Sequence, residues 1–481
     1  MFKRLLLLSG ILTTVILSLA MTSCLKNKTN NTENPNGAPL LKDGIGFNVP
    51  KGVCDGEEIS IYLAMPSYAK SYIAEEETGD DLNDAVYKRN ALVEEHTGAK
   101  LKFGLTTGTG RGFEQEAEAT KIRTLIQSGD DTYDAFIHAQ RTDLFTSFMD
   151  GLFVDWYELP YVNLKNPWWY SNVLRDTSYG GKLFAMTGDY NLNSFAQIEC
   201  LLFNKTICDE IGLEYPYQLV LDGEWTHDKF VEYIKAGTKD VNGDGKIEYS
   251  SDRMGFTGYM YEQIPALFVG YGGDCITKDE RNLPVLVVDS VHNYDVLDKM
   301  LEVFDISGSK YFQISDGGPI NHDLFNEGKV LFNDSFISNV PSTRGLENID
   351  IGFIPYPKFD DSQEQYYSRT ANLSGFTYIP VTNKNLEATG AVLETMAYYS
   401  GDTMLKKYFD IVLSLKSTRD IESEKMIPII RNSSRFEDIM IPFDGIQIVT
   451  AGVGNTLSST VAAYNDIWES TVEDLVEFYE E

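Results

Sequence analysis

Residues 58–63 read EISIYL, a short apolar run typical of a buried β-strand. Apolar residues at near-helical spacing follow over residues 82–97, and residues 100–105 (KLKFGL) predict a second strand. A helix is expected over residues 113–127 and a third strand over residues 134–139 (DAFIHA). This alternation predicts a doubly wound α/β unit with a mainly parallel sheet.

A second α/β region follows. Apolar runs predict strands over residues 183–186, 200–203, 285–288, 330–332 and 351–354. Helices are expected over residues 226–236, with Thr226 as the cap, and over residues 386–400, 404–415 and 461–480. A chain of 481 residues is about three times a typical domain, so two or more compact units are expected.

The composition narrows the class of protein. With 43% hydrophobic residues the chain can bury a large core, which excludes global disorder. It carries 72 acidic against 40 basic residues, a formal charge of −32. Phosphate binding needs clustered Lys and Arg, so this balance argues against nucleic acid as a partner.

The amino terminus has the pattern of a secretory signal over residues 1–23. Lys3 and Arg4 precede an apolar run over residues 5–21, and small residues then lead to Cys24. The segment resembles a bacterial lipobox, although Met21 stands where Leu is commoner. That resemblance implies cleavage before Cys24, a diacylglyceryl thioether on its sulfur and an acyl chain such as palmitate on its amine. The alternative is an uncleaved signal anchor in which Cys24 is incidental.

Residues 24–56 are expected to form a flexible tether, because Asn, Thr, Pro and Gly dominate them without apolar periodicity. No later apolar run approaches a transmembrane length. The remaining cysteines are Cys54, Cys200, Cys208 and Cys275, whose spacing matches no zinc site. Buried free thiols are favoured, and disulfides stay open as the alternative.

An acidic loop resembles the first half of an EF-hand calcium loop. Asp240, Asn242 and Asp244 supply oxygens at alternate positions, and Lys246 offers its carbonyl. The closing carboxylate arrives one residue late, as Asp252. We expect a structural Ca²⁺ here, and the alternative is a turn satisfied by its own backbone.

Several segments in order resemble the sugar-type extracellular solute-binding proteins of ABC importers, in the form common in Gram-positive bacteria. They read LFNK at 202–205, GEWT at 223–226, DVNGDG at 240–245, DRMGF at 252–256, FNEGK at 325–329, IGFIPYPK at 351–358 and RDIES at 419–423.

The resemblance implies an α/β fold of the two-lobed periplasmic-binding-protein type (type II), with discontinuous lobes around a hinge cleft. Residues 57–142 plus 369–417 would form lobe 1, and residues 143–368 plus 418–481 lobe 2. The protein would be a monomer on the extracellular face of the cell membrane, held there only by its lipid. It would bind a carbohydrate and deliver it to the transmembrane subunits of an ABC permease, without catalysis.

A sugar presents apolar faces and hydroxyl rims, so its site needs aromatic rings beside polar side chains. Asp189 is the best single candidate, because Asp189, Tyr190 and Asn191 interrupt an apolar region. For every candidate the alternative is ordinary packing or surface exposure. The candidates at strand ends and crossings are Tyr68, Gln140, Arg141, Asp189, Tyr190, Asp334, Phe336 and Arg369.

Three other functions stay open. A secreted glycoside hydrolase would use two carboxylates about 5–10 Å apart. A receptor for peptides or another polar solute could share the same scaffold. An adhesin would have no cleft.

Overall fold

The computed structural model describes residues 45–109, 113–139, 144–312, 320–346, 349–371, 373–413, 421–436 and 457–480. The signal, Cys24, most of the tether, Gln140 and Arg141 lie outside these ranges, so the predictions made for them stay predictions. Residues 1–48 and residues 49–481 form separate units. All helices and strands described below belong to the second unit.

The first sheet has four strands in the order β12-β3-β1-β2. β1 lies parallel to β2 and to β3, while β12 runs antiparallel to β3. The three predicted strands and both predicted helices of this region are present, and β12 joins them from far along the chain. The bounds are β1 Glu58–Leu63, β2 Lys100–Leu105, β3 Ala135–Ala139, β12 Gly375–Tyr378, α3 Asp81–Thr97, α4 Phe113–Gln127 and α13 Leu386–Ser400.

Local signals mark both boundaries of helix α3. The side chain of Asp80 accepts hydrogen bonds from the backbone amides of Leu82 and Asn83, which the first helical turn leaves without partners. Gly98 ends the helix in the left-handed region at φ 76°, which glycine adopts without strain. Both signals are local, so they need no tertiary context.

The second sheet has five strands in the order β10-β4-β9-β5-β8. β4 is antiparallel to β9 and β10, and β5 is parallel to β8 and β9. The bounds are β4 Glu199–Asn204, β5 Met254–Tyr259, β8 Ser309–Phe312, β9 Val330–Phe336, β10 Ile351–Ile354, α7 Lys205–Ile211, α8 Tyr217–Leu221, α9 His227–Gly237, α10 Met260–Gly270, α11 Val291–Phe304 and α12 Ile320–Asn326.

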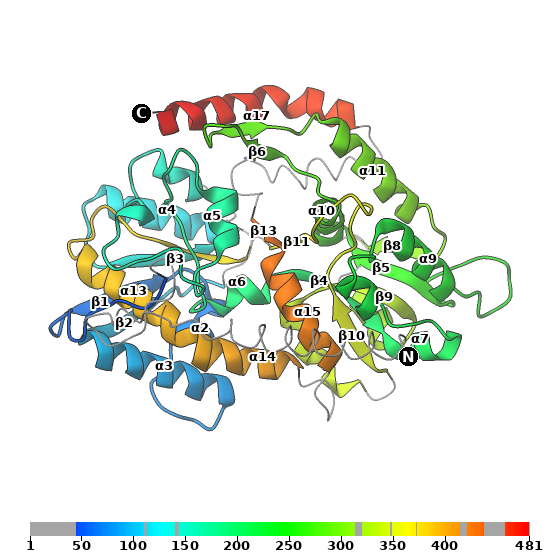
Figure 1. Ribbon diagram of the computed structural model, residues 1–481, viewed down its shortest axis with the longest axis horizontal. Helices are drawn as coiled ribbons and strands as arrows, with labels where there is room; N and C mark the ends of the chain where they lie inside the picture. Colours follow the sequence, from blue (N-terminus) through cyan, green and yellow to red (C-terminus); the bar gives the residue numbers. More distant parts are fainter. Residues whose placement is uncertain are drawn as a thin grey trace, which may run out of the picture. The chain divides into compact units, whose positions relative to one another are not determined.

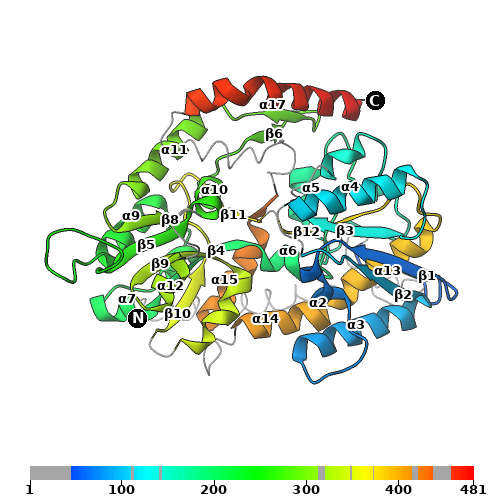
Figure 2. The same cartoon turned by 180° about the vertical axis from the view of Figure 1, so that it is seen from behind.

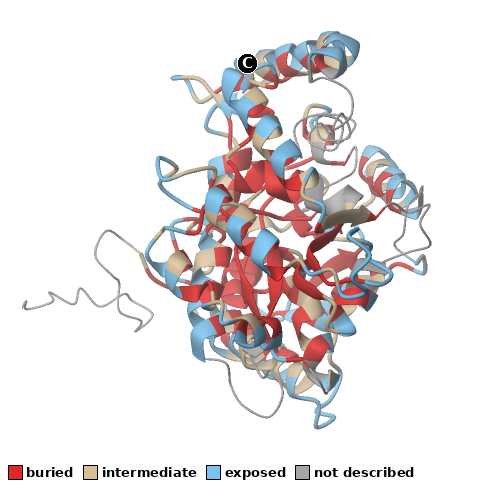
Figure 3. Cartoon of the chain, turned by 90° about the vertical axis from the view of Figure 1, so that its right-hand side faces the viewer, coloured by how far each residue is buried: buried red, intermediate tan, exposed pale blue. Residues whose placement is uncertain are grey.

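We call the first sheet with its helices the first lobe and the second sheet with its helices the second lobe (Figures 1 and 2). Most strands of both sheets are largely buried, whereas the edge strands β2 and β8 are exposed or half-buried along most of their length (Figure 3). Within the described residues, no helix combines the length and apolarity needed to cross a membrane.

Several local predictions need correction. Of the strand expected over residues 183–186, only Met186 forms a bridge, to Thr377. Thr226 precedes α9 but its side chain makes no capping hydrogen bond. The strand expected over residues 285–288 is β7 (Pro284–Leu286), which pairs only with β6 (Ile276–Lys278) in a separate hairpin.

The lobe boundary predicted at residues 142 and 143 is also displaced. The backbone amide of Val154 donates to the carbonyl of Ile379, and that of Met186 donates to Thr377, at the edge of the first sheet. The carboxylate of Glu394 on α13 accepts from both indole nitrogens of Trp168 and Trp169. Residues 153–190 therefore belong with the first lobe. An extended apolar run could pair with either sheet, so the sequence did not distinguish the two.

Short elements connect the lobes. β11 (Ser368–Arg369) lies parallel to β13 (Ser434–Arg435), and Ile198 bridges to Thr370. The third predicted crossing, near residue 417, lies outside the described residues. The remaining helices are α2 Ala69–Tyr72, α5 Ser171–Thr177, α6 Leu192–Ala196, α14 Lys406–Leu413, α15 Ile421–Asn432 and α17 Leu457–Glu480.

Candidate functional site

Asp189, the strongest candidate from the sequence, forms an ion pair with a residue that lies far along the chain. Its carboxylate accepts a hydrogen bond from the guanidinium of Arg431, in the last turn of α15. That guanidinium also lies over the ring of Tyr170, 4.9 Å from its centre. Burial raises the pKa of Asp189, and the charge of Arg431 opposes the rise. An aspartate, an arginine and an aromatic ring therefore meet at one place.

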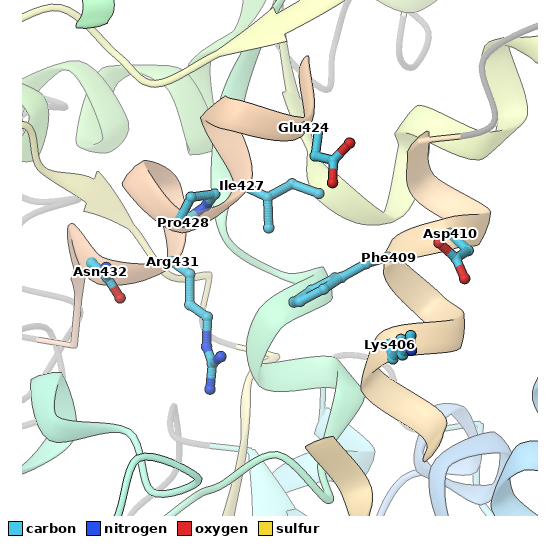
Figure 4. Close-up of a pocket in the computed structure, with 8 residues that line it drawn as sticks. All are labelled: Lys406, Phe409, Asp410, Glu424, Ile427, Pro428, Arg431 and Asn432. Atoms are coloured by element: carbon cyan, nitrogen blue, oxygen red, sulfur yellow. The ribbon is translucent and has the colours of Figure 1, made fainter. Parts of the chain in front are cut away.

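Arg431 also lines a pocket of about 730 Å³ between α14 and α15 (Figure 4). Phe409 extends from α14 into the space between the two helices, toward Ile427 and Arg431 of α15. α15 contacts β10 and α8 of the second lobe. α14 contacts α3 of the first lobe and also Ile337–Gly345, which follows β9 of the second. The walls of the pocket thus come from elements attached to different lobes. The lining residues are Lys406, Phe409, Asp410, Glu424, Ile427, Pro428, Arg431 and Asn432.

A second arginine, four residues further on, repeats the arrangement. Arg435 on β13 donates to both oxygens of Asp274, at 3.0 and 3.2 Å, and stacks on the ring of Tyr367 at 4.7 Å. Its Nε lies 3.7 Å from the carboxylate of Asp176 on α5. Asp274 follows α10 of the second lobe, and α5 belongs to the segment that packs on the first. Arg435 therefore links both lobes through two carboxylates.

The other predicted ligand residues of the first lobe are buried and bonded within the protein. The Tyr68 hydroxyl donates to the carbonyl of Leu373 at 3.2 Å. The Tyr190 hydroxyl lies 2.7 Å from the Thr377 hydroxyl. Both side chains are fully buried, so in this conformation they shape the end of the sheet.

The predicted residues of the second lobe gather at the start of β4. Arg369 pairs with Glu199 at 2.9 Å, and the hydroxyl of Tyr356 donates to Asp334. Phe336 lies opposite Glu199 in the ladder between β4 and β9. The fold therefore separates the predicted residues into two groups, and their role in ligand binding stays a prediction.

Sequence reasoning identified Asp189 but missed Arg431, Arg435 and the carboxylates that Arg435 contacts, Asp274 and Asp176. The available signal was the polar run over residues 431–435 (RNSSR), which ends the apolar turn IPII. Two arginines that follow a buried apolar turn invite a search for carboxylates. Their partners Asp189 and Asp274 lie far away in sequence, and only the fold brings them together.

The acidic loop is closed by hydrogen bonds to its own backbone. Asp240 accepts from the amides of Gly243 and Gly245, at 2.6 and 2.8 Å. Asp252 accepts from the amides of Val241 and Glu248, at 2.9 and 2.8 Å, so it folds back toward the loop. Among the described residues, no group of three or more His, Cys, Asp or Glu is arranged to hold a metal. The Ca²⁺ site, with Asn242, Asp244 and Lys246, stays a prediction.

Cys54, Cys200 and Cys208 are buried free thiols, and Cys275 is buried as well. This confirms the interpretation favoured from the sequence for Cys54, Cys200 and Cys208. Burial raises the pKa of the Cys54 thiol to about 11, so the thiol stays protonated at neutral pH.

Comparison with known proteins places this geometry in a family. Residues 74–402 match the bacterial extracellular solute-binding proteins. The chain belongs to this family, and its two-lobed α/β fold is the one expected from the sequence. No curated protein matches the chain significantly.

Solved structures support the fold. An ABC substrate-binding protein from Listeria monocytogenes, in complex with cycloalternan, is 16% identical with a TM-score of 0.52, over 87% of this chain and 100% of that one. The GacH receptor of Streptomyces glaucescens, solved with acarbose, is 14% identical with a TM-score of 0.54, and the match covers 87% of this chain and 99% of that one. UgpB from Mycobacterium tuberculosis, in complex with glycerophosphocholine, is 14% identical with a TM-score of 0.51, and the match covers 87% of this chain and 99% of that one.

Proposed function

We propose that this protein captures an oligosaccharide and delivers it to the transmembrane subunits of an ABC permease. Membership of the solute-binding family indicates that the general function is solute binding. Two of the similar structures were solved with the carbohydrate ligands cycloalternan and acarbose, which supports a sugar as the solute. The third holds a different polar solute, glycerophosphocholine, which is the main alternative.

The observation that carries the proposal is the pair of arginine–aspartate contacts, each beside a tyrosine ring, where the lobes are linked. Carboxylates and guanidinium groups hydrogen-bond sugar hydroxyls, and aromatic rings pack on the apolar faces of a sugar. The side chain of Asp274 is 28% exposed, that of Arg431 is 24% and that of Arg435 is 12%, so part of each side chain reaches solvent. Binding there would favour lobe closure, because the groups come from both lobes.

The proposal extends to the location and chemistry of the protein. We propose that lipid on Cys24 anchors a monomer to the extracellular face of the cell membrane, because the amino terminus resembles a lipobox. Its only membrane contact would be that lipid. We further propose that the protein is a receptor without enzymatic activity, as its family implies.

Isothermal titration calorimetry of the purified protein against maltotetraose, cycloalternan, acarbose and glycerophosphocholine tests the solute class. We expect heat and a defined stoichiometry with at least one of the three carbohydrates. Binding of glycerophosphocholine alone would contradict the carbohydrate assignment and favour the alternative. Release of reducing sugar during the titration would instead favour a hydrolase.

A further inference from the structure

The C-terminal helix α17 lies along the hairpin formed by β6 and β7, as both cartoon views show (Figures 1 and 2). The hairpin connects α10 to α11, and these helices contact β5 and β8 of the second lobe. One face of α17 is buried at helical spacing. Its buried residues are Val461, Trp468, Val472, Leu475 and Tyr479.

The last turn of α17 packs on the first lobe. The ring of Phe478 lies 5.2 Å from that of Phe148 and 5.7 Å from that of Phe184, and these two rings are themselves stacked at 4.9 Å. The ammonium of Lys182 lies 4.9 Å from the centre of the Phe478 ring. The segment that carries Phe184 is held to the first lobe, because Met186 pairs with Thr377.

The hairpin reaches the same segment independently. Lys278 donates from its ammonium to the carbonyl of Ser178 at 2.7 Å, and the amide of Gly180 donates to the carbonyl of Asn282 at 2.9 Å. Arg281 at the hairpin tip then forms an ion pair with Glu480, so hairpin and helix are tied to each other. Hairpin and helix therefore connect the lobes through contacts of their own, beside the contact of α5 with β13.

We infer that α17 and the β6–β7 hairpin form a strap that holds the two lobes closed and so sets how long a bound solute is retained. The inference about retention rests on the proposed function, whereas the inference about closure does not. Opening the lobes must separate Lys278 from Ser178, or Phe478 from Phe148 and Phe184. Removing either contact shifts the population toward the open form, which weakens apparent affinity in proportion to the closed fraction.

The test uses two variants from opposite sides of the strap. Phe478→Ala removes the ring contacts. Lys278→Met removes the ammonium, which also lies 4.8 Å from the centre of the Tyr179 ring, and keeps an apolar side chain of similar length. Phe478→Leu should partly restore the wild-type behaviour because it retains apolar contact. Ile467→Ala is the matched control, because this residue of the same helix is 45% exposed. Circular dichroism and thermal melts establish that each variant is folded.

Small-angle X-ray scattering of the protein without solute is the first readout. We expect a larger radius of gyration for Phe478→Ala and Lys278→Met, and wild-type values for the control. Folded variants with unchanged scattering would overturn the strap, whether or not the protein binds sugar. The second readout is the dissociation rate of maltotetraose, expected to rise about fivefold, since an aromatic contact is worth about 1 kcal/mol. If maltotetraose fails to bind even the wild type, the proposed solute fails and the scattering result still decides the strap. If it binds, an unchanged rate in variants that do open would overturn the role in retention.

Discussion

Arg369 and Glu199 form a buried ion pair at the junction of the lobes, with Nη1 and Oε1 2.9 Å apart and side chains only 3% and 0% exposed. The pair joins β11 to β4. The sequence predicts Arg369 as a ligand residue, and the fold places its guanidinium inside the protein, against Glu199. Removing one partner of such a pair leaves an uncompensated buried charge.

We therefore expect Glu199→Ala to lower the free energy of unfolding by about 3–5 kcal/mol, measured by urea denaturation. The exposed pair of Lys229 and Glu232, at 2.8 Å, supplies the control. Glu232→Ala should cost less than about 1 kcal/mol. Equal effects of the two substitutions would contradict a structural role for the buried pair.

The carboxyl of Glu394 makes stability depend on pH. Burial raises its pKa to about 7, although Trp169 and Asn166 donate hydrogen bonds to it. Between about pH 4.5 and 7 the folded state holds this proton and the unfolded state does not. The folded state binds more protons, so this stability is fully present below about pH 4.5 and is lost as pH rises through 7.

We expect the melting temperature to fall from pH 5 to pH 7.5, with Glu394 contributing up to about 3 kcal/mol. Asp189, whose pKa burial also raises, acts in the same direction. Glu394→Gln should be less stable, because its amide faces hydrogen-bond donors, and should show a smaller pH dependence. Melts of the variant that follow the wild-type pH profile would exclude Glu394 as the group.

Arg435 tests the proposed solute contacts. Arg435→Lys keeps the charge but loses the planar stacking on Tyr367 and the Nη2 atom that donates to both oxygens of Asp274. We expect carbohydrate affinity to fall about tenfold in calorimetry, the cost of one charge-assisted hydrogen bond. Arg123→Lys is the control, since Arg123 pairs with Asp150 at the surface at 3.5 Å. Equal carbohydrate affinities of the two variants would show that Arg435 does not contribute to solute binding.

Calcium decides between two interpretations of the acidic loop. If the loop binds Ca²⁺, addition of the ion at about 100 times its dissociation constant should stabilise the fold by about 3 kcal/mol, and EDTA should reverse the effect. Asp240→Asn and Asp244→Asn should abolish the response. Asp360→Asn, in another loop, should retain it. A melting temperature insensitive to Ca²⁺ would favour a turn closed by its own hydrogen bonds.

Lipid attachment makes a prediction in cells. Cys24→Ala should prevent acylation and release the protein from the membrane fraction into the medium, detected by fractionation and immunoblotting. Two or more acyl chains give stable anchoring, so the wild type should stay with the membrane after a salt wash. A Cys24→Ala protein that remained membrane-bound at its full precursor length would support an uncleaved signal anchor.

The sequence predicted much of the first lobe because its signals are local. Strands β1, β2 and β3 and helix α3 follow from apolar spacing, and Gly98 marks the end of the helix. The candidate site was less accessible. Asp189 was identified as an interruption of an apolar region, but Arg431 lies 242 positions away along the chain, so no local pattern pairs them. Tyr68 and Tyr190 were chosen as aromatic residues near strand ends, and their burial depends on how β12 returns to the first sheet.

Residue order and periodicity by themselves determined the α/β class, the succession of elements, the acidic balance and the resemblance to a solute-binding family. These properties depend on interactions within a few residues, or on composition alone. Tertiary structure alone decided that residues 153–190 pack on the first lobe, that Arg431 and Arg435 find Asp189 and Asp274, and that α17 lies along a hairpin of the other lobe. Such contacts join residues hundreds of positions apart, and which partners meet is settled only when whole apolar surfaces are buried together.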